Sequence, residues 1–331
     1  MFLNNSLNFI LNKIHARREF TDEYVASSTQ HEYFKQISNR KSDGTLRMIY
    51  EPKTDEHSGL YKSIYEGLKE YQPQLHDAVH GFRSGFSNVT NASQHLSANH
   101  LFNIDIENFY AQINDIDVLA VLLGLGANTE VATYLSKLCT IDGVLPQGFN
   151  TSPDIANHHL SALDAALSEY ALERDITYTR YVDDMSFSSE GQIEASEICD
   201  IVESFGLPLA QTKRKYQKRG ANQYVTGLTV FDSERPRIGK KYKRRIRLEL
   251  HVISKVGIAA FTARLHELPD QPQDEGEAEK WNEVLNELAD KKLSQLKGRL
   301  DYINGVEPLV AQKMYPIYEE IIADRKKNSK S

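Results

Sequence analysis

The sequence is poor in cysteine, tryptophan and long hydrophobic runs. It holds two cysteines, Cys139 and Cys199, and one tryptophan in 331 residues. Both cysteines lie in apolar segments of helical periodicity, so we expect buried core thiols rather than a disulfide or a metal site. No apolar run approaches the about 20 residues that span a bilayer, and the first residues carry no basic leader or cleavage site. These absences predict a cytoplasmic globular protein without membrane association, built from two or three subdomains.

Net positive charge is also lacking, since the chain carries −7 at pH 7. The charge is unevenly distributed, because residues 212–251 hold thirteen Lys or Arg and only three acidic residues. This concentration is higher than a solvated helix face requires and is typical of phosphate binding. A localisation signal or a heparin-type patch is the alternative interpretation of such a run.

Two adjacent carboxylates, Asp183 and Asp184, interrupt a stretch of alternating residues at 176–189. Alternation on both sides of an acidic pair predicts a β-hairpin with the pair at its turn. Taken alone, the same pattern fits a solvated surface turn equally well, because Asp is common in turns.

A third carboxylate, Asp105, lies inside the apolar segment 101–106. A charge in a buried strand is costly unless a cation or a metal compensates it. Two strands that present Asp side chains side by side can hold two divalent ions about 3.5–4 Å apart, as in polymerases and nucleases. We therefore expect Asp105, Asp183 and Asp184 to form a metal site for phosphoryl transfer.

Two further segments suit a nucleotide. In the turn-rich loop 145–153, Gln147 can project its amide toward a base or a sugar, and Gly148 permits close approach of the backbone. The apolar spacing after this loop predicts one helix. In the segment 40–53, an Asp-Gly pair predicts a hairpin with Lys41 at its tip and Arg47 on its flank. Such a hairpin can reach over a triphosphate, although a generic cationic hairpin has the same sequence pattern.

In this order and spacing, the motifs resemble those of reverse transcriptases, and among them the bacterial retron type. Two short signatures carry the retron resemblance, Asn91-Ala92-x-x-His95 and Val225-Thr226-Gly227, the second in a strand expected over 224–230. Without that context, His95 would be interpreted as a hydrogen-bonded structural histidine. The resemblance covers essentially the whole chain.

The resemblance implies an α+β right-hand polymerase with fingers, a ferredoxin-like palm and a helical thumb. N-terminal helices and fingers would occupy residues 1–100. Independently of the resemblance, apolar residues at helical spacing, up to Phe34 and Ile37, predict two helices in the segment to about residue 36. The palm would occupy 101–232, with part of the fingers inserted at about 117–150. The thumb would occupy 233–331 and would begin with the basic RNA-binding segment.

The reaction implied is RNA-directed DNA synthesis from deoxynucleoside triphosphates with two Mg²⁺, for which Mn²⁺ is the alternative. Asp105 and Asp183 would be the principal ligands and Asp184 a supporting one. The residues implied to contact the nucleotide are Arg47, Lys41 as a looser match, Tyr110 as a steric gate, Gln147, Gly148 and Lys213. The residues expected to bind RNA are Lys240, Lys241, Lys243, Arg244, Arg245 and Arg247.

The retron type also implies partners. A structured noncoding RNA would be template and primer, and synthesis from its 2′-hydroxyl would give branched multicopy single-stranded DNA used in antiphage defence with a separate effector protein. Two alternatives stay open. One is another bacterial reverse transcriptase, of the group II intron or phage-defence kind. The other is a scaffold that holds an RNA–DNA hybrid and restrains a toxin.

Overall fold

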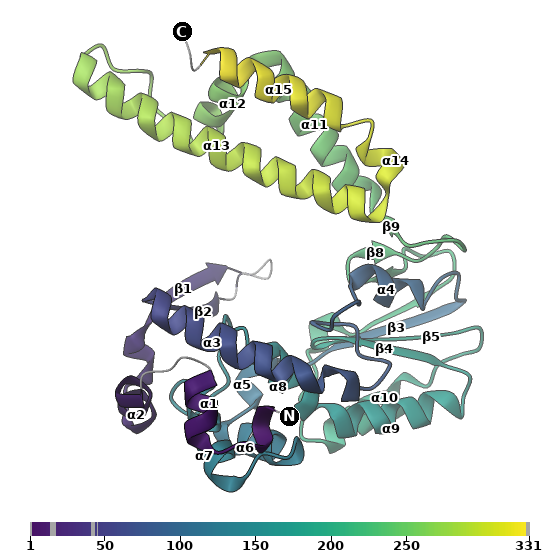
Figure 1. The fold of residues 1–331 in the computed structure, drawn as a ribbon. Helices are drawn as coiled ribbons and strands as arrows, with labels where there is room; N and C mark the ends of the chain where they lie inside the picture. Colours follow the sequence, from purple (N-terminus) through teal and green to yellow (C-terminus); the bar gives the residue numbers. More distant parts are fainter. Residues whose placement is uncertain (1, 14–17, 41–43, 45, 329–331) are drawn as a thin grey trace. The chain divides into compact units, whose positions relative to one another are not determined.

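A four-stranded antiparallel sheet positions the acidic residues. Its strand order is β4-β5-β3-β6, with β3 at His100–Asp105, β4 at Thr177–Tyr181, β5 at Asp184–Ser189 and β6 at Lys215–Lys218 (Figure 1). The predicted hairpin is confirmed, because β4 and β5 pair with Tyr181 opposite Asp184. Strand β3 pairs with β5 on one side and with β6 on the other, which makes it a central strand.

The structure is a computed structural model that describes residues 2–13, 18–40, 44 and 46–328. The chain divides into two compact units, Met1–Thr226 and Gly227–Ser331. The boundary lies within the predicted signature Val225-Thr226-Gly227. The finer division of the first unit into fingers and palm remains a prediction.

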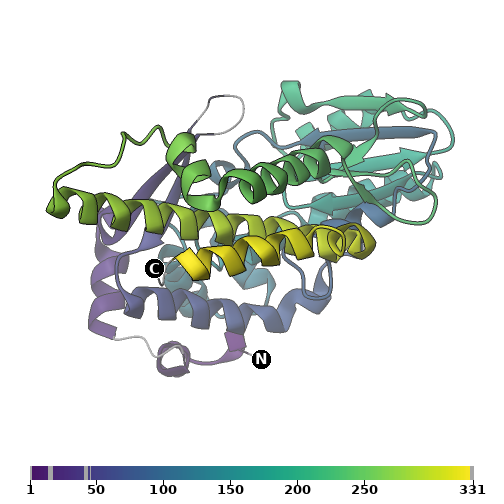
Figure 2. The same cartoon turned by 90° about the horizontal axis from the view of Figure 1, so that it is seen from above.

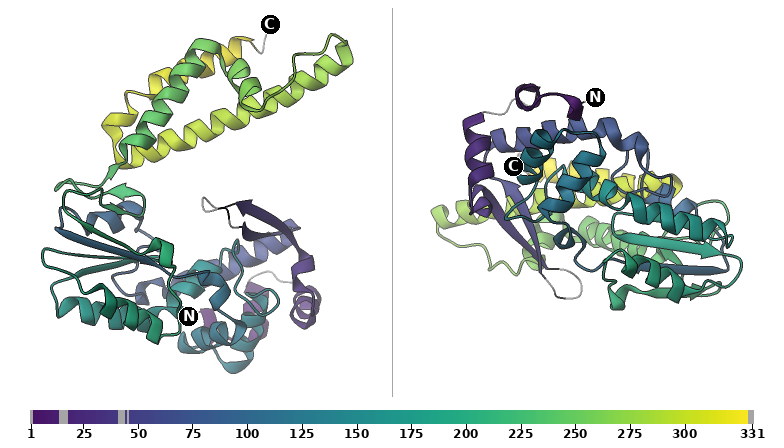
Figure 3. Two further views of the ribbon diagram at one scale, coloured as in Figure 1. Left: turned by 180° about the vertical axis from the view of Figure 1, so that it is seen from behind. Right: turned by 90° about the horizontal axis from the view of Figure 1, so that it is seen from below.

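Helices cover both faces of the sheet. Helices α9 (Ser161–Leu172) and α10 (Ala195–Ser204) lie on one face, and the short α4 (Asn88–Ser93) lies on the other (Figure 3). Because side chains alternate along a strand, Tyr178 and Arg180 of β4 point toward α9, where they bond Asp164. Thr179 between them points toward the α4 side, where it contacts His95.

The rest of the first unit consists of helices and a separate two-stranded sheet. The hairpin strands are β1 (Phe34–Arg40) and β2 (Leu46–Pro52), paired antiparallel along their whole length. The helices are α1 (Leu7–Lys13), α2 (Arg18–Ala26), α3 (Asp55–Leu68), α5 (Phe109–Gln112), α6 (Asp115–Gly124), α7 (Thr129–Leu138) and α8 (Ser152–His159). The 3₁₀ turns are η1 (Phe2–Asn4), η2 (Gln30–Tyr33), η3 (Lys69–Gln74) and η4 (Gln211–Lys213).

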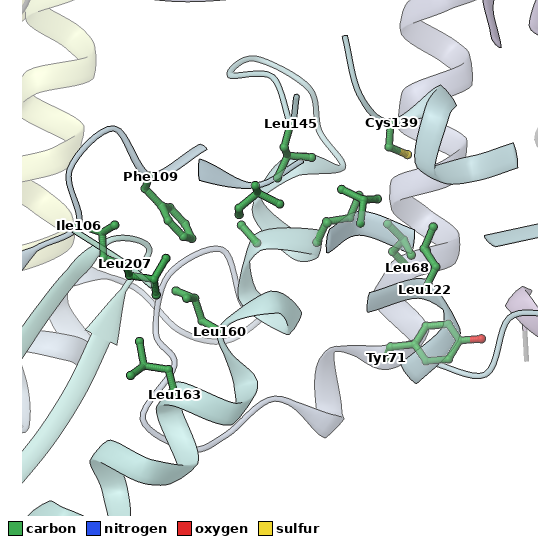
Figure 4. Close-up of a cluster of buried hydrophobic side chains, with 14 of the residues drawn as sticks. Leu68, Tyr71, Ile106, Phe109, Leu122, Cys139, Leu145, Leu160, Leu163 and Leu207 are labelled. Carbon is green, nitrogen blue, oxygen red and sulfur yellow. The ribbon is translucent and has the colours of Figure 1, made fainter. Parts of the chain in front are cut away.

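One continuous apolar cluster joins these helices to the end of the sheet (Figure 4). Ile106 and Leu207 near the strands belong to the same cluster as Leu163 of α9 and Leu122 of α6. Cys139 lies buried within it, and Cys199 is also buried, so the expectation of free core thiols is confirmed. The cluster fixes the loops that leave the strands, and these loops carry the candidate site.

Three expectations about elements were wrong. Phe34 and Ile37 belong to strand β1 rather than to a second N-terminal helix. The single helix expected after residue 153 is divided into α8 and α9. The strand expected over 224–230 is instead β7 (Tyr224–Val225) and β8 (Leu228–Thr229), with a turn at Thr226 and Gly227, whose φ angles are 45° and 82°.

The second unit is mainly helical. After β8 and β9 (Arg237–Ile238) come α11 (Lys240–Val256), α12 (Ile258–Leu265), α13 (Glu275–Val306), α14 (Pro308–Ala311) and α15 (Tyr315–Asn328). The 32-residue α13 is the longest, and α11, α12 and α15 pack along it (Figure 2). Leu250, Leu296 and Leu300 are among the residues buried in this bundle. Among the described residues, no helix has the length and apolar character needed to cross a membrane.

Candidate active site

A cavity of about 750 Å³ opens beside the turn of the β4–β5 hairpin. Its volume is within the range of small-molecule sites. Its charged and polar lining includes Arg47, Asp105, Tyr110, Gln147, Asp183, Asp184 and Lys213. Residues from five separate parts of the sequence therefore meet at one cavity, all of them in the first unit.

The three carboxylates meet because the strands pair. In the β3–β5 register Asp105 lies opposite Asp184, and the amide of Ile106 donates to the carbonyl of Asp183 at 3.3 Å. The Nζ of Lys213 donates to Oδ2 of Asp105 at 2.6 Å. Asp105 is buried, whereas Asp184 is accessible to water at the mouth of the cavity.

The carboxylates carry more negative charge than their surroundings neutralise. Desolvation by the cavity walls and the charge of Asp105 raise the pKa of Asp183. Partial desolvation, followed by the charges of Asp183 and Asp105, also raises the pKa of Asp184. Surplus negative charge on hard oxygen ligands fits a divalent cation such as Mg²⁺.

The fit is that of an open metal site. Asp105, Asp183 and Asp184 lie at one cavity, but across the described ranges no group of three or more His, Cys, Asp or Glu side chains is arranged to hold an ion by itself. Mg²⁺ is commonly bound by one or two carboxylates together with water and substrate phosphates. Asp105 and Asp183, supported by Asp184, are suited to that partial ligation.

The turn between β4 and β5, which carries Asp183 and Asp184, has a strained backbone and is hydrogen-bonded to a buried side chain. Val182 has φ 62°, a left-handed conformation that β-branched residues rarely adopt. Its carbonyl accepts a 2.9 Å bond from Nη1 of Arg180. Arg180 is fully buried and forms a bidentate pair with Asp164 of α9, at 2.7 and 2.6 Å. Breaking such a buried pair costs about 3–5 kcal/mol, so Arg180 ties the turn to the core.

The remaining nucleotide-side residues come from β2 and the loop 145–153. The amide of Tyr50 donates to the carbonyl of Gln147 at 2.8 Å, which fixes this loop against β2. Gly148 has φ 114°, and a Cβ there would lie 2.4 Å from the carbonyl oxygen of Tyr50. Only glycine fits this close approach. Lys41 lies outside the described residues.

Tyr110 borders the cavity beside Phe109, with ring centroids 5.4 Å apart. Burial and the charge of Asp183 raise the pKa of its hydroxyl, so the ring is neutral at physiological pH. Lys213 is bonded to Asp105 here, so its expected contact with phosphates would require that bond to open or be shared.

The Val225-Thr226-Gly227 signature contacts the helix that begins the other signature, away from the cavity. Oγ1 of Thr226 donates to the carbonyl of Asn88 in α4, the helix that also contains Asn91 and Ala92. Both ring nitrogens of His95 are bonded to hydroxyls at 2.7 Å, those of Ser188 and Thr179. Burial, followed by the charge of His80, lowers the pKa of His95 to about 3. His95 is therefore a neutral residue that links β4 and β5.

Two of the α11 residues that were expected to bind RNA, Lys243 and Arg245, form ion pairs within the second unit. Lys243 is directed to the buried carboxylate of Glu307, at 3.0 and 2.8 Å. Arg245 pairs with Glu249 at 3.4 Å, although its side chain stays 72% exposed. Lys243 therefore has its charge compensated within the fold, and its expected contact with RNA stays a prediction. Lys240, Lys241, Arg244 and Arg247 are exposed.

Sequence reasoning missed Arg180 and Asn157. Arg180 was visible only as one member of the alternation before the acidic pair. The argument applied to Asp105, that a charge in a buried strand needs compensation, also applies to it. Asn157 of α8 carried no signal, because its partners Gly81 and Arg180 are distant from it in the sequence.

Comparisons with known proteins agree with this geometry. Residues 39–219, more than half of the chain, match the family model described as reverse transcriptase (RNA-dependent DNA polymerase). The retron Ec86 reverse transcriptase of Escherichia coli is 34% identical over 221 residues, covering 66% of this chain and 68% of that protein. The retron Mx162 reverse transcriptase of Myxococcus xanthus is 27% identical, covering 81% of this chain and 56% of that protein.

A solved structure, apo telomerase from Candida tropicalis truncated from its C-terminal domain, aligns with a TM-score of 0.44 and 12% identity, covering 62% of this chain and 54% of that one. The family match and the retron relatives establish the family of this chain without that structural alignment. The chain belongs to the reverse transcriptases, the RNA-directed DNA polymerases, and within them to the bacterial retron type.

Proposed function

We propose that this polymerase copies a structured noncoding RNA into DNA, beginning at a 2′-hydroxyl of that RNA, and leaves a branched RNA–DNA product. The observation that carries the proposal is the shared cavity in which three carboxylates, Lys213, Arg47, Tyr110 and Gln147 meet. Retron relatives support the choice of RNA. A role in antiphage defence in the bacterial cytoplasm, with a separate effector protein, belongs to the same proposal.

Each residue has a distinct task in this reaction. Arg47 and Lys213 would bind the triphosphate, and the amide of Gln147 would contact the sugar or the base. The ring of Tyr110 would lie against C2′ of the sugar. Asp105 and Asp183 would hold Mg²⁺, with Asp184 in support, and Arg180 would keep their turn in place. When bound, Mg²⁺ supplies activation of the primer hydroxyl and stabilisation of the pyrophosphate leaving group.

Polymerase chemistry is tested first on a generic substrate. We expect the purified chain to extend an oligo(dT) primer on poly(rA) with dTTP and Mg²⁺. Asp183→Asn and Asp105→Asn should each reduce extension by at least about 1,000-fold, or about 4 kcal/mol of transition-state stabilisation. RNA binding, measured by filter retention, should change little because the basic residues of α11 are untouched. Robust extension by either variant would refute the assignment of the carboxylates.

The priming mode is tested separately. The chain is expressed together with its neighbouring DNA, and the nucleic acid bound to it is isolated. A DNA strand whose mobility changes after treatment with a 2′,5′-debranching enzyme supports priming from a 2′-hydroxyl. DNA that is free of RNA, or that is released by alkali without a branch nucleotide, would contradict it.

A further inference from the structure

We propose that the ring of Phe82 is a stacking platform for a nucleobase of the base pair being formed at the active site. The inference deepens the proposed function and rests on it. Phe82 lines the same cavity as Asp183 and Asp184, yet 55% of its surface is exposed. An aromatic face left open in this cavity is available to a flat ligand.

The backbone at Phe82 holds the ring in place at a conformational cost. Phe82 has φ 53°, in the left-handed region that bulky residues avoid. Its carbonyl accepts from Nε2 of Gln72 at 3.3 Å, and Oε1 of the same Gln72 accepts from the amide of Ser84 at 3.2 Å. Gln72 is itself buried and donates to Asp154 at 2.6 Å. A strained conformation fixed by a buried side chain is more common at functional sites than at ordinary surface turns.

The turn that carries Phe82 is coupled to the catalytic hairpin. A Cβ on Gly81 would lie 2.5 Å from the amide nitrogen of Val182, so the two turns are in backbone contact. Nδ2 of Asn157 donates to the carbonyl of Gly81 at 2.9 Å. Oδ1 of Asn157 accepts from Arg180 at 3.0 Å, the guanidinium that also bonds the Val182 carbonyl. These contacts therefore fix the position of the turn that carries Phe82 relative to the turn that carries the carboxylates.

The chemistry of the cavity identifies the ligand class. Arg47 and Lys213 suit phosphates and the carboxylates suit divalent metal ions, whereas Phe82 offers an apolar π-face. A nucleotide has both a polyanionic part and a flat aromatic part. Base–aromatic stacking tolerates any sequence because every base has a π-face, as a template-copying enzyme requires. The base is either that of the template or that of the incoming nucleotide.

Extension kinetics test the platform. Replacement of Phe82 by Ala should lower kcat/KM for a single correct insertion about tenfold, the size of the effect expected from removing one base–aromatic stack. Phe82→Trp should retain most of the activity, and Phe82→Leu, which keeps apolar bulk without a π-face, should be intermediate. Phe205→Ala, which removes another exposed phenylalanine outside the cavity, is the matched control and should be unchanged. Wild-type efficiency in Phe82→Ala would overturn the proposal.

Fluorescence of 2-aminopurine separates the two sources of the base and needs no turnover. The probe is placed either in the templating position or in the incoming deoxynucleoside triphosphate. Quenching by the unaltered chain that Phe82→Ala relieves identifies the base concerned. If neither probe responds to Phe82→Ala, or if the unaltered chain quenches neither, the platform is refuted. Failure of the unaltered chain to extend any primer would instead refute the proposed function, and the fluorescence result would still stand.

Discussion

Tyr110 follows the acidic strand by five residues and borders the cavity that the carboxylates share. An aromatic ring packed against C2′ of a nucleotide excludes a 2′-hydroxyl by steric overlap. We predict that Tyr110→Val loses about tenfold or more of its preference for deoxynucleotides over ribonucleotides, in line with the selectivity that one steric contact supplies. The measurement is the ratio of kcat/KM values for dTTP and UTP on one template.

Tyr110→Phe is the control, since it keeps the ring and removes the hydroxyl. It should discriminate as the unaltered chain does. An unchanged ratio in Tyr110→Val would assign the selection to another residue.

Asp154 gives a prediction about pH. Its carboxyl is buried, Oδ1 accepts from Gln72, and Oδ2 has no hydrogen-bond partner among the described residues. Burial raises the pKa of Asp154 to about 6 from 3.8, against the opposing effects of Gln72 and Lys69. As the pH rises, the Asp154 carboxyl therefore loses its proton at a lower pH in the unfolded chain than in the folded chain. The free energy of unfolding consequently falls as the pH rises from about 4 to 6.

Asp154→Asn removes this pH dependence. We predict that the free energy of unfolding of the variant minus that of the unaltered chain increases between about pH 4 and 6, by roughly 2–3 kcal/mol. Above about pH 6 the difference should be constant. Urea titrations across the range from acid to mildly alkaline pH measure it, and a difference that does not vary with pH would show that the carboxyl is solvated.

At the scale of elements, the sequence predicted those elements whose conformation depends on residues close to one another in the chain. The β4–β5 hairpin was predictable because period-two alternation surrounds Asp183 and Asp184, and only a turn brings both flanks together. Phe34 and Ile37 have a spacing that fits a helix, yet pairing with β2 places them in a strand. The partners of Arg180 lie 16 and 23 residues away on α9 and α8, so no local pattern could identify its role.

Helix α11 shows the same limit of prediction from sequence. Some of its basic residues are exposed, whereas Lys243 forms an ion pair within the fold, and the sequence alone does not distinguish them. Lys243 is 14% exposed in its side chain and pairs with Glu307, which is 4% exposed and also accepts from the amide of Ile238 at 2.9 Å. We predict that Lys243→Met destabilises the chain on the order of 3 kcal/mol, because the buried carboxylate of Glu307 then keeps only the more distant Arg237, at 3.8 Å, as a cationic partner. Chemical denaturation, followed through the unfolding transition of the second unit, measures this destabilisation.

The neighbouring Arg244→Ala is the matched control, since Arg244 is exposed. It should change the stability by no more than about 0.5 kcal/mol. Adding Glu307→Gln to Lys243→Met should restore part of the stability, and an additive double variant would show that the pair is not coupled.

At the scale of the whole molecule, a chain of net charge −7 must bind a polyanion through a concentrated region. The exposed residues Lys240, Arg244 and Arg247 recur on one side of α11. We predict that their combined replacement by Ala weakens binding of a stem-loop RNA. The slope of log K against log salt should fall by about 2–3, because each phosphate that the protein no longer neutralises lowers it by about 0.7–0.9.

The control removes the same charge elsewhere. Lys280, Lys291 and Lys326 are exposed on α13 and α15, and their combined replacement by Ala removes three positive charges, as the α11 variant does. This variant should keep the salt slope of the unaltered chain. Equally weakened binding in both triple variants would mean that overall charge, rather than α11, governs RNA binding.

Asn157 has a consequence for copying accuracy. Its one amide group joins the Gly81 turn to Arg180, and Arg180 holds the hairpin of the carboxylates. We therefore expect the two turns to move together. A mismatched pair of abnormal width that displaces the Gly81 turn would also displace Asp183, so we expect a mispair to slow its own incorporation and the addition of the next nucleotide.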